Sequence, residues 1–313
     1  MPFVVRRLLA VVPTVLVVAT ATFLALQVVP GDVATIMLGV DARPEELGRL
    51  RRELGLDRPL VVRYVEWLGR LARIDLGTSV SYREPVTRLV AQRLPVTVSV
   101  ALGAMVVALG VALPVGIAAA RRAWSPLDLA ALAGSQLGLA IPTFWLGILL
   151  LLGFAAAWPV FPLQGYVALA HDPAQWLRHL ALPALALGLE RAAALTRLVR
   201  AAVLDELRRD YVRTARSKGL GDATVLRRHV LRNALIPVLT VAGLQLGFLL
   251  GGTIVIEQVF GLPGLGRLLL QGIYARDLLI VQGAVLAIAT MFALLNLVVD
   301  LLYAAADPRI TYD

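Results

Sequence analysis

Apolar residues form six runs along the chain, each long enough to cross a membrane as a helix. About 20 such residues are needed to span roughly 30 Å of hydrocarbon. The first run follows Arg6 and Arg7, and its 22 residues lack a small-residue cleavage site, which predicts an uncleaved anchor rather than a signal peptide. The predicted spans are residues 8–29, 96–120, one helix within 127–158, 177–203, 233–256 and 278–305.

Two predicted spans contain residues that a regular membrane helix does not favour. Pro142 lies inside 127–158 and predicts a kink, because proline removes a backbone hydrogen bond from a helix. The span 177–203 is interrupted by Glu190, Arg191 and Arg197. Adjacent residues point to different faces of a helix, so we expect snorkelling or a salt bridge to another span rather than substrate contact for two of these, Glu190 and Arg191.

The charges between the runs predict the orientation of the chain. Residues 190–232 hold eleven Arg and Lys against five acids, and the turn 121–126 holds two Arg and no acid, so both are predicted to be cytoplasmic. Residues 159–176 have no Arg or Lys, and 257–277 have two, which places both segments outside. Both termini are then cytoplasmic. Residues 30–95 also fall outside despite eleven arginines, because long segments are translocated regardless of charge.

The outer segment 30–95 predicts two short helices. The first ends at Gly55, and Asp57 and Pro59 open the second. One apolar face of this second helix either packs on the bundle and membrane surface or docks a partner protein. It is formed by Leu60, Tyr64, Trp67, Leu68 and Leu71.

Composition supports a membrane protein and excludes several kinds of chemistry. The chain is 59% hydrophobic and 16% charged, with mean hydropathy +0.79. The net charge is +9, and the basic residues lie mainly beside apolar runs, which favours contact with lipid head groups over contact with nucleic acid. There are no cysteines, the three histidines lack metal-ligand spacing, and Gly219 follows the only lysine, Lys218, where a P-loop needs Ser or Thr. We therefore expect neither catalysis nor a bound cofactor or metal.

A charged hairpin interrupts this apolar pattern before the fifth span. Apolar side chains recur at intervals of 3, 4 and 4 residues and predict one amphipathic helix, which Gly219 and Gly221 end. Asp222 is then expected to cap a helix that runs into the fifth span. The residues alone allow either a protein-binding hairpin or a charged loop facing lipid. The apolar stripe consists of Leu204, Leu207, Tyr211 and Ala215.

The sequence "YVRTARSKGL", followed by "RRHVLRNALIPVLT", resembles the EAA loop of ATP-binding cassette (ABC) importer membrane subunits, in the branch that serves peptides, opines and nickel. By this resemblance, Arg213, Thr214 and Ala215 stand for the Glu-Ala-Ala triplet, and Gly219 for the glycine four residues on. Arg213 departs from the family's glutamate, and Arg232 stands where the general motif has proline. Both departures are usual in the peptide branch, so they narrow the resemblance to that branch of the family.

Other segments extend the resemblance over essentially the whole chain, including "AIPTFWLGILLLLGFA" and "GGTIVIEQVFGLPGLG". The implied fold is an all-α membrane protein, a bundle of six transmembrane helices with the type I ABC importer permease fold. The implied divisions are an anchor helix at 1–30, an extracytoplasmic loop at 31–95, a permease core at 96–305 with the coupling loop 204–232, and a cytoplasmic tail at 306–313.

The resemblance implies that the chain forms half of a translocation pore for di- or oligopeptides in the plasma membrane of a bacterium or archaeon. The implied partners are a second related permease, two ATPases that use ATP and Mg²⁺, and an extracytoplasmic solute-binding protein. Closure of the ATPases would pull on the coupling loops and rock the spans. The implied ATPase-coupling residues are Tyr211, Arg213, Thr214, Ala215, Lys218, Gly219 and Asp222.

Some alternatives stay open. Gln136, Gln245 and Asn296 lie inside apolar spans, where they either bond neighbouring helices or line the substrate path. The same fold could serve nickel, an opine or an oligosaccharide, although the spans lack a histidine or methionine cluster that would suggest a metal path. A stand-alone secondary carrier or a scaffold is the remaining alternative, and the coupling loop argues against it.

Overall fold

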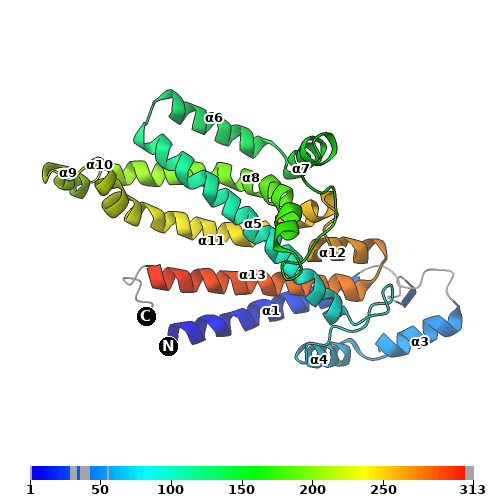
Figure 1. The fold of residues 1–313 in the computed structure, drawn as a ribbon. Helices are drawn as coiled ribbons and strands as arrows, with labels where there is room; N and C mark the ends of the chain where they lie inside the picture. Colours follow the sequence, from blue (N-terminus) through cyan, green and yellow to red (C-terminus); the bar gives the residue numbers. More distant parts are fainter. Residues whose placement is uncertain (1, 29–33, 36–42, 55, 307–313) are drawn as a thin grey trace. The chain divides into compact units, whose positions relative to one another are not determined.

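The computed structural model describes residues 2–28, 34–35, 43–54 and 56–306, which are almost entirely helical (Figure 1). An isolated bridge joins Thr78 to Pro85. The chain divides into two units, Met1–Val96 with Pro263–Leu294, and Thr97–Leu262 with Leu295–Asp313. The helices are α1 (Pro2–Val28), α3 (Pro44–Leu54), α4 (Leu60–Leu71), α5 (Val86–Arg121), α6 (Pro126–Ala140), α7 (Thr143–Leu151), the π-helix η1 (Leu152–Ala157), α8 (Pro173–Leu207), α9 (Asp210–Ser217), α10 (Asp222–Thr224), the π-helix η2 (Val225–Val230), α11 (Leu231–Val259), α12 (Leu265–Tyr274) and α13 (Leu278–Ala306).

A helix occupies each of the predicted spans. Among the described residues, three helical stretches are long and apolar enough to cross a membrane: Val86–Arg121, Asp222–Val259 and Leu278–Leu301. The first predicted span corresponds to α1, whose apolar part is Leu9–Ala25. The fourth corresponds to α8, whose charged residues lower its hydropathy. Six spans with both termini in the cytoplasm stay a prediction.

The third predicted span is two helices rather than one kinked helix. α6 ends at Ala140, α7 begins at Thr143, and the two are bent by 95°. Pro142 occupies the N-cap position of α7, and Ile141 before it is extended. Proline disfavours helical backbone in the preceding residue, and its missing N–H is not needed at a helix start. Pro142 therefore ends one helix and opens the next.

Small residues bring α5 and α8 close together in the second unit. A Cβ on Gly188 would lie 2.6 Å from the carbonyl oxygen of Ala104, and a Cβ on Gly116 would lie 2.9 Å from that of Thr196. α8 also packs against α6, α7 and α11. Close approach at glycine is a usual means of joining helices in a membrane, where apolar surface alone gives little driving force. α8 is therefore the central helix of this unit.

The charged residues of α8 find partners within the same unit. Asp128 of α6 is fully buried and accepts two hydrogen bonds from Arg200, the one from Nη2 at 2.6 Å. Arg191 donates to Gln245 of α11 at 3.0 Å, and its Nε lies 3.6 Å from the carboxylate of Glu190. Arg191 thus reaches another helix through a hydrogen bond to a neutral side chain, and its ion pair is with its own neighbour Glu190 rather than the predicted salt bridge to another span. These contacts keep charge away from hydrocarbon.

In the first unit, α4 packs its predicted apolar face against α1. Trp67 is buried in a cluster with Ala19 and Phe23 of α1, and Tyr64, Leu68 and Leu71 lie at the edge of this cluster. Leu60 is exposed, and the N-cap position belongs to Pro59 rather than Asp57. Gly55 lies outside the described residues. Packing within the chain therefore accounts for most of this face, and partner docking stays an alternative.

A buried carboxylate fastens the loop of residues 74–86 within the first unit. Asp277 lies between α12 and α13 and accepts hydrogen bonds from Ser79 Oγ at 2.7 Å, from the Ser81 amide at 3.0 Å and from the Ile280 amide at 3.3 Å. The Asp277 side chain is almost completely buried. Several donors to one carboxylate offset the cost of burying its charge. We call this arrangement the Asp277 latch.

Candidate functional site

The predicted coupling loop is a hairpin of short helices where α8 and α11 meet (Figure 1). α8 ends at Leu207 and α9 begins at Asp210, so the prediction of one continuous helix through Leu204 and Ala215 is wrong. The acidic residues explain the break. Asp205 and Glu206 oppose the negative end of the α8 dipole, whereas Asp210 favours the start of a new helix.

Gly219 ends α9, as predicted. Its amide donates to the Arg216 carbonyl at 2.9 Å, and the Leu220 amide donates to the Ala215 carbonyl at 3.3 Å, which is the hydrogen-bond pattern of a Schellman motif. Gly219 has φ +78°, in the left-handed region that glycine enters without steric cost. The turn after α9 therefore depends on this glycine.

Asp222 does not cap the next helix, contrary to the prediction. The N-cap position belongs to Gly221, and the Asp222 carboxylate accepts a hydrogen bond from Arg216 Nε at 3.2 Å instead. The guanidinium offers a charged donor, which makes a stronger hydrogen bond than a backbone amide. From Asp222 the chain continues as one helical stretch of 38 residues to Val259. The prediction that this helix runs into the fifth span is therefore confirmed.

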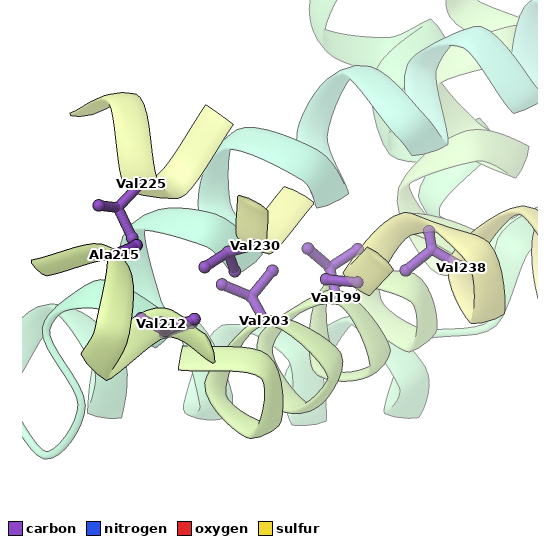
Figure 2. Close-up of a cluster of buried hydrophobic side chains, with 9 residues drawn as sticks. Val199, Val203, Val212, Ala215, Val225, Val230 and Val238 are labelled. Atoms are coloured by element: carbon purple, nitrogen blue, oxygen red, sulfur yellow. The ribbon is translucent and has the colours of Figure 1, made fainter. Parts of the chain in front are cut away.

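The inner face of α9 is buried in an apolar cluster. Val212 and Ala215 point into it, and Leu204 and Leu207 pack against it from the end of α8. Three residues of the predicted apolar stripe, Leu204, Leu207 and Ala215, thus pack together across the break between the helices. The fourth, Tyr211, is exposed, and Val212 lies in the cluster instead. Figure 2 shows a close-up of the cluster's buried side chains. Their full set is Ala120, Val199, Val203, Val212, Ala215, Val225, Val230, Ala234 and Val238, which we call the hairpin cluster.

The outer face of α9 is exposed and carries most of the predicted coupling residues. Arg213, Thr214, Lys218 and Gly219 are all exposed, and the Arg213 side chain retains 81% of its accessible surface. Arg213 lies 3.8 Å from the equally exposed Asp210, a surface ion pair that contributes little stability. These side chains are therefore available to a partner protein.

Tyr211 differs from the other predicted coupling residues. Its hydroxyl donates to the Glu206 carboxylate and accepts a hydrogen bond from Asn233 Nδ2 at 3.1 Å. Partial burial and the hydrogen bond to Glu206 both raise the pKa of Tyr211, while Asn233 and Arg209 lower it by less. The hydroxyl therefore stays protonated at neutral pH and acts as a donor.

Two of the three residues predicted for the substrate path bond to arginines of α8. Gln245 accepts from Arg191, and the Gln136 side-chain oxygen lies 3.5 Å from an Arg197 donor. Both contacts join two helices, which supports the alternative that these residues serve interhelical bonding. Asn296 is half-buried on α13. A role for any of the three in lining a pathway stays a prediction.

Three buried carboxylates were not singled out from the sequence: Asp128, Asp277 and Glu257. Glu257 accepts a hydrogen bond from Thr97 Oγ1 at 2.6 Å. Each lies at an end of an apolar run, and this position is a sequence signal that could have identified it as a candidate. Its hydrogen-bond partner could not be found in this way, because the partners lie up to 198 positions away along the chain. The described residues place no group of three or more His, Asp or Glu where it could hold a metal ion.

Comparisons with known proteins agree on the kind of protein. The family described as "Binding-protein-dependent transport system inner membrane component" matches residues 112–312, and its N-terminal counterpart matches residues 1–101. A Brucella suis biovar 1 protein named as a peptide transport system permease is 44% identical over 310 residues, 99% of each chain. The glutathione transport system permease of Salmonella typhi is 40% identical over 312 residues, again 99% of each chain.

Two solved structures share the fold. The methionine ABC transporter MetNI in an inward-facing conformation aligns with a TM-score of 0.54 at 19% identity, covering 70% of this chain and 96% of that one. An amino acid ABC transporter with histidines aligns with a TM-score of 0.50 at 18% identity, covering 72% and 95%. At this level of identity the similarity shows the fold alone. It supports an all-α membrane protein with the architecture of an ABC transporter permease.

Proposed function

The chain belongs to the family of inner-membrane components of binding-protein-dependent transport systems, and from that premise we propose that it is a peptide-importing permease driven by ATPase partners through α9. It is a membrane-embedded permease subunit of a transport system. The proposal adds the substrate, the partners and the residues that contact them. Two relatives that match over 99% of this chain are named for peptide and for glutathione transport, and glutathione is itself a tripeptide.

The observation that carries the coupling role is the two-sided construction of α9. Its inner face is buried in the hairpin cluster with residues of α8 and α11, and its outer face is exposed. A helix built this way can receive a force on one side and pass it to two long helices on the other. The contact surface that we propose consists of Arg213, Thr214, Lys218, Gly219 and Asp222. Ala215 would contribute by packing, since it is buried.

Charge on α9 also indicates the chemistry of the partner. α9 and the turn after it carry Arg213, Arg216 and Lys218 against Asp210 and Asp222. Where the general family motif has glutamate, this chain has Arg213. A groove on the ATPase that accepts α9 is therefore expected to present carboxylates, because opposite charges steer association and set specificity.

The remaining parts of the proposed complex follow from the family. A second related permease would complete the pore, two ATPases would bind ATP and Mg²⁺, and a solute-binding protein would deliver peptide from outside. This chain would bind no cofactor of its own and would lie in the plasma membrane of a bacterium or archaeon, in contact with lipid.

Reconstitution in liposomes tests the proposal. The permease is purified with its second permease and ATPases, and uptake of labelled glutathione, a labelled dipeptide, ⁶³Ni²⁺ and a labelled oligosaccharide is measured with the binding protein, with and without ATP. ATP-dependent uptake of a peptide is the expected result. Uptake that needs no ATP would indicate a secondary carrier, and uptake of nickel or oligosaccharide without peptide would overturn the proposed substrate.

Charge reversal on α9 tests the contact surface separately. Arg213→Glu combined with Lys218→Glu is expected to abolish co-purification of the ATPases while the protein still inserts. Arg49→Glu is a matched control, because Arg49 is an equally exposed arginine on α3 in the segment predicted to lie outside. Retention of the ATPases by the α9 double variant would contradict the proposed surface.

A further inference from the structure

We propose that Tyr211 is a positioning residue of the coupling hairpin, whose hydroxyl holds α9 against α8 and α11 so that all three move together. This inference rests on the proposed function and deepens it. It gives Tyr211 a role inside the permease, distinct from the exposed residues that would touch the ATPase.

The geometry of the Tyr211 hydroxyl connects three helices through one oxygen atom. Tyr211 is the second residue of α9 and donates to Glu206 in the last turn of α8. Asn233 in the first turn of α11 donates to the same oxygen at 3.1 Å. Asn233 also reaches the His229 carbonyl of η2 at 3.4 Å, so the network extends into the π-helix. We call these contacts the Tyr211 clamp.

Directional contacts are needed here because the backbone has two weak points beside α9. The helix breaks at residues 208–209, and the π-helix η2 replaces regular α-helix at Val225–Val230. A helix of eight residues is not stable by itself, and π-helical turns often occur at sites that must change shape. Val212 and Ala215 attach α9 by apolar contact, which is non-directional and allows sliding. Hydrogen bonds from one hydroxyl to both flanking helices would oppose that sliding.

Removal of the hydroxyl should therefore weaken the coupling of ATP hydrolysis to transport while the complex with the ATPases stays assembled. In Tyr211→Phe the ring and the whole hairpin cluster remain, so the ATPase still binds and hydrolyses ATP. α9 can then shift relative to α8 and α11, at residues 208–209 and at η2, each time the ATPases close. We expect normal or raised ATP hydrolysis with less substrate moved per ATP.

The experiment measures glutathione transported per ATP hydrolysed by the complete complex in liposomes. Tyr211→Phe removes the hydrogen bonds with Glu206 and Asn233, and Glu206→Ala removes the first of them. Each variant is expected to lower this ratio by about three- to tenfold, the range that one or two lost hydrogen bonds give. Glu206→Gln should retain most of it, since the amide oxygen still accepts from the hydroxyl. The double variant Tyr211→Phe with Glu206→Ala should be no worse than Tyr211→Phe alone, because that single change already removes the contact with Glu206.

Tyr82→Phe is the matched control. Tyr82 is also an exposed tyrosine whose hydroxyl donates to a side chain, Gln271 at 3.0 Å, but it does so in the first unit. The inference is overturned if Tyr211→Phe transports as much glutathione per ATP as the wild type and Tyr82→Phe. It is also overturned if Tyr211→Phe loses the ATPases while Glu206→Ala keeps them, since the hydroxyl would then belong to the contact surface.

A second measurement does not depend on the substrate. Amide hydrogen exchange in residues 210–217 of the assembled complex should be several-fold faster in Tyr211→Phe than in the wild type. Unchanged protection would overturn the inference whatever the complex transports. A wild-type complex that moves no peptide, with fast exchange in the variant, would instead overturn the proposed substrate and leave the clamp supported.

Discussion

The α9 hairpin and the Asp277 latch both hold a short surface segment against long helices, but they use opposite chemistry. In the hairpin, valines and alanines carry the packing, and charged side chains remain outside. In the latch, one buried carboxylate accepts three hydrogen bonds from the neighbouring loop and helix. Apolar packing is strong but tolerates small displacements, whereas a buried carboxylate with several donors permits one geometry.

This difference suggests different duties for the two segments. On the proposed function, the hairpin must stay attached to α8 and α11 while it moves, and the Tyr211 clamp would restrict sliding at this apolar contact. The latch tolerates less movement, because displacement of residues 79–81 would deprive the buried Asp277 carboxylate of two of its three donors. We therefore expect the hairpin to fail by loss of coupling and the latch to fail by loss of stability.

The largest effect is expected when a charge enters the hairpin cluster. Val212→Asp would place a carboxylate among valines, at a cost of about 3–5 kcal/mol, which α9 can escape only by detaching. Rapid proteolysis within residues 208–222 and loss of the ATPases would show this. Thr214→Asp adds the same charge to the exposed face of the same helix. Equally rapid proteolysis of the two variants would contradict the two-sided construction, whereas loss of the ATPases does not separate them, because Thr214 belongs to the proposed contact surface.

The latch should respond almost as strongly to loss of its carboxylate. Asp277→Ala leaves the buried Ser79 hydroxyl and two amides without their acceptor, and should lower the free energy of unfolding by about 3 kcal/mol. Thermal unfolding in detergent measures this. Asp75→Ala is the control, because Asp75 accepts from the Gly77 amide at 2.9 Å in an exposed turn. A latch variant as stable as this control would show that the loop is held by other contacts.

A smaller effect is expected at the turn after α9. Gly219→Val would force a β-branched residue into φ +78°, at a cost of about 1–2 kcal/mol. An added Cβ meets no atom within 4 Å, so the strain would lie in the backbone alone. The variant should insert normally but lose ATPase coupling, measured as peptide uptake per ATP. Asn tolerates this backbone region, so Gly219→Asn should retain most coupling; equal loss in both would point to the surface rather than the turn.

The smallest effect concerns pH and the Tyr211 clamp. A raised pKa means that folding favours the neutral hydroxyl, so its stabilisation is present below the ordinary value of 10.0 and is lost as pH rises through the raised value. The difference in α9 exchange protection between wild type and Tyr211→Phe should stay constant from about pH 6 to 9 and shrink above pH 10. A difference that already disappears near neutral pH would show that another group controls the contact.

Local rules predicted much of the fold correctly because they depend on residues close in sequence. The apolar runs marked the long helices, and Gly219 marked the end of α9 through its left-handed backbone. Pro142 correctly predicted an irregularity in the third span, but the predicted kink is a complete break, and the two helices beside it are bent by 95°. A proline's effect on its own helix is local, but whether the chain continues or turns depends on what packs against both halves.

Two side chains of the hairpin have partners that the sequence did not predict. Asp222 has the residue type and position of an N-cap, yet its carboxylate bonds Arg216 across the turn. Tyr211 has the pattern of a surface contact residue, yet its hydroxyl faces Glu206 and Asn233. The fold brings several possible partners within reach of a side chain, and the side chain forms its hydrogen bond with the strongest available donor or acceptor.

The sequence alone determined that this protein is a helical membrane protein with a cationic hairpin, because hydrophobic run length and glycine turns act over short stretches of chain. The loop charges predict that this hairpin is cytoplasmic. Only the tertiary structure decided which polar groups are paired inside. Asp128 lies 72 positions from Arg200, and Ser79 lies 198 positions from Asp277. The interaction energies of these pairs depend on burial and on the distances between their atoms, and both are set only when the chain folds.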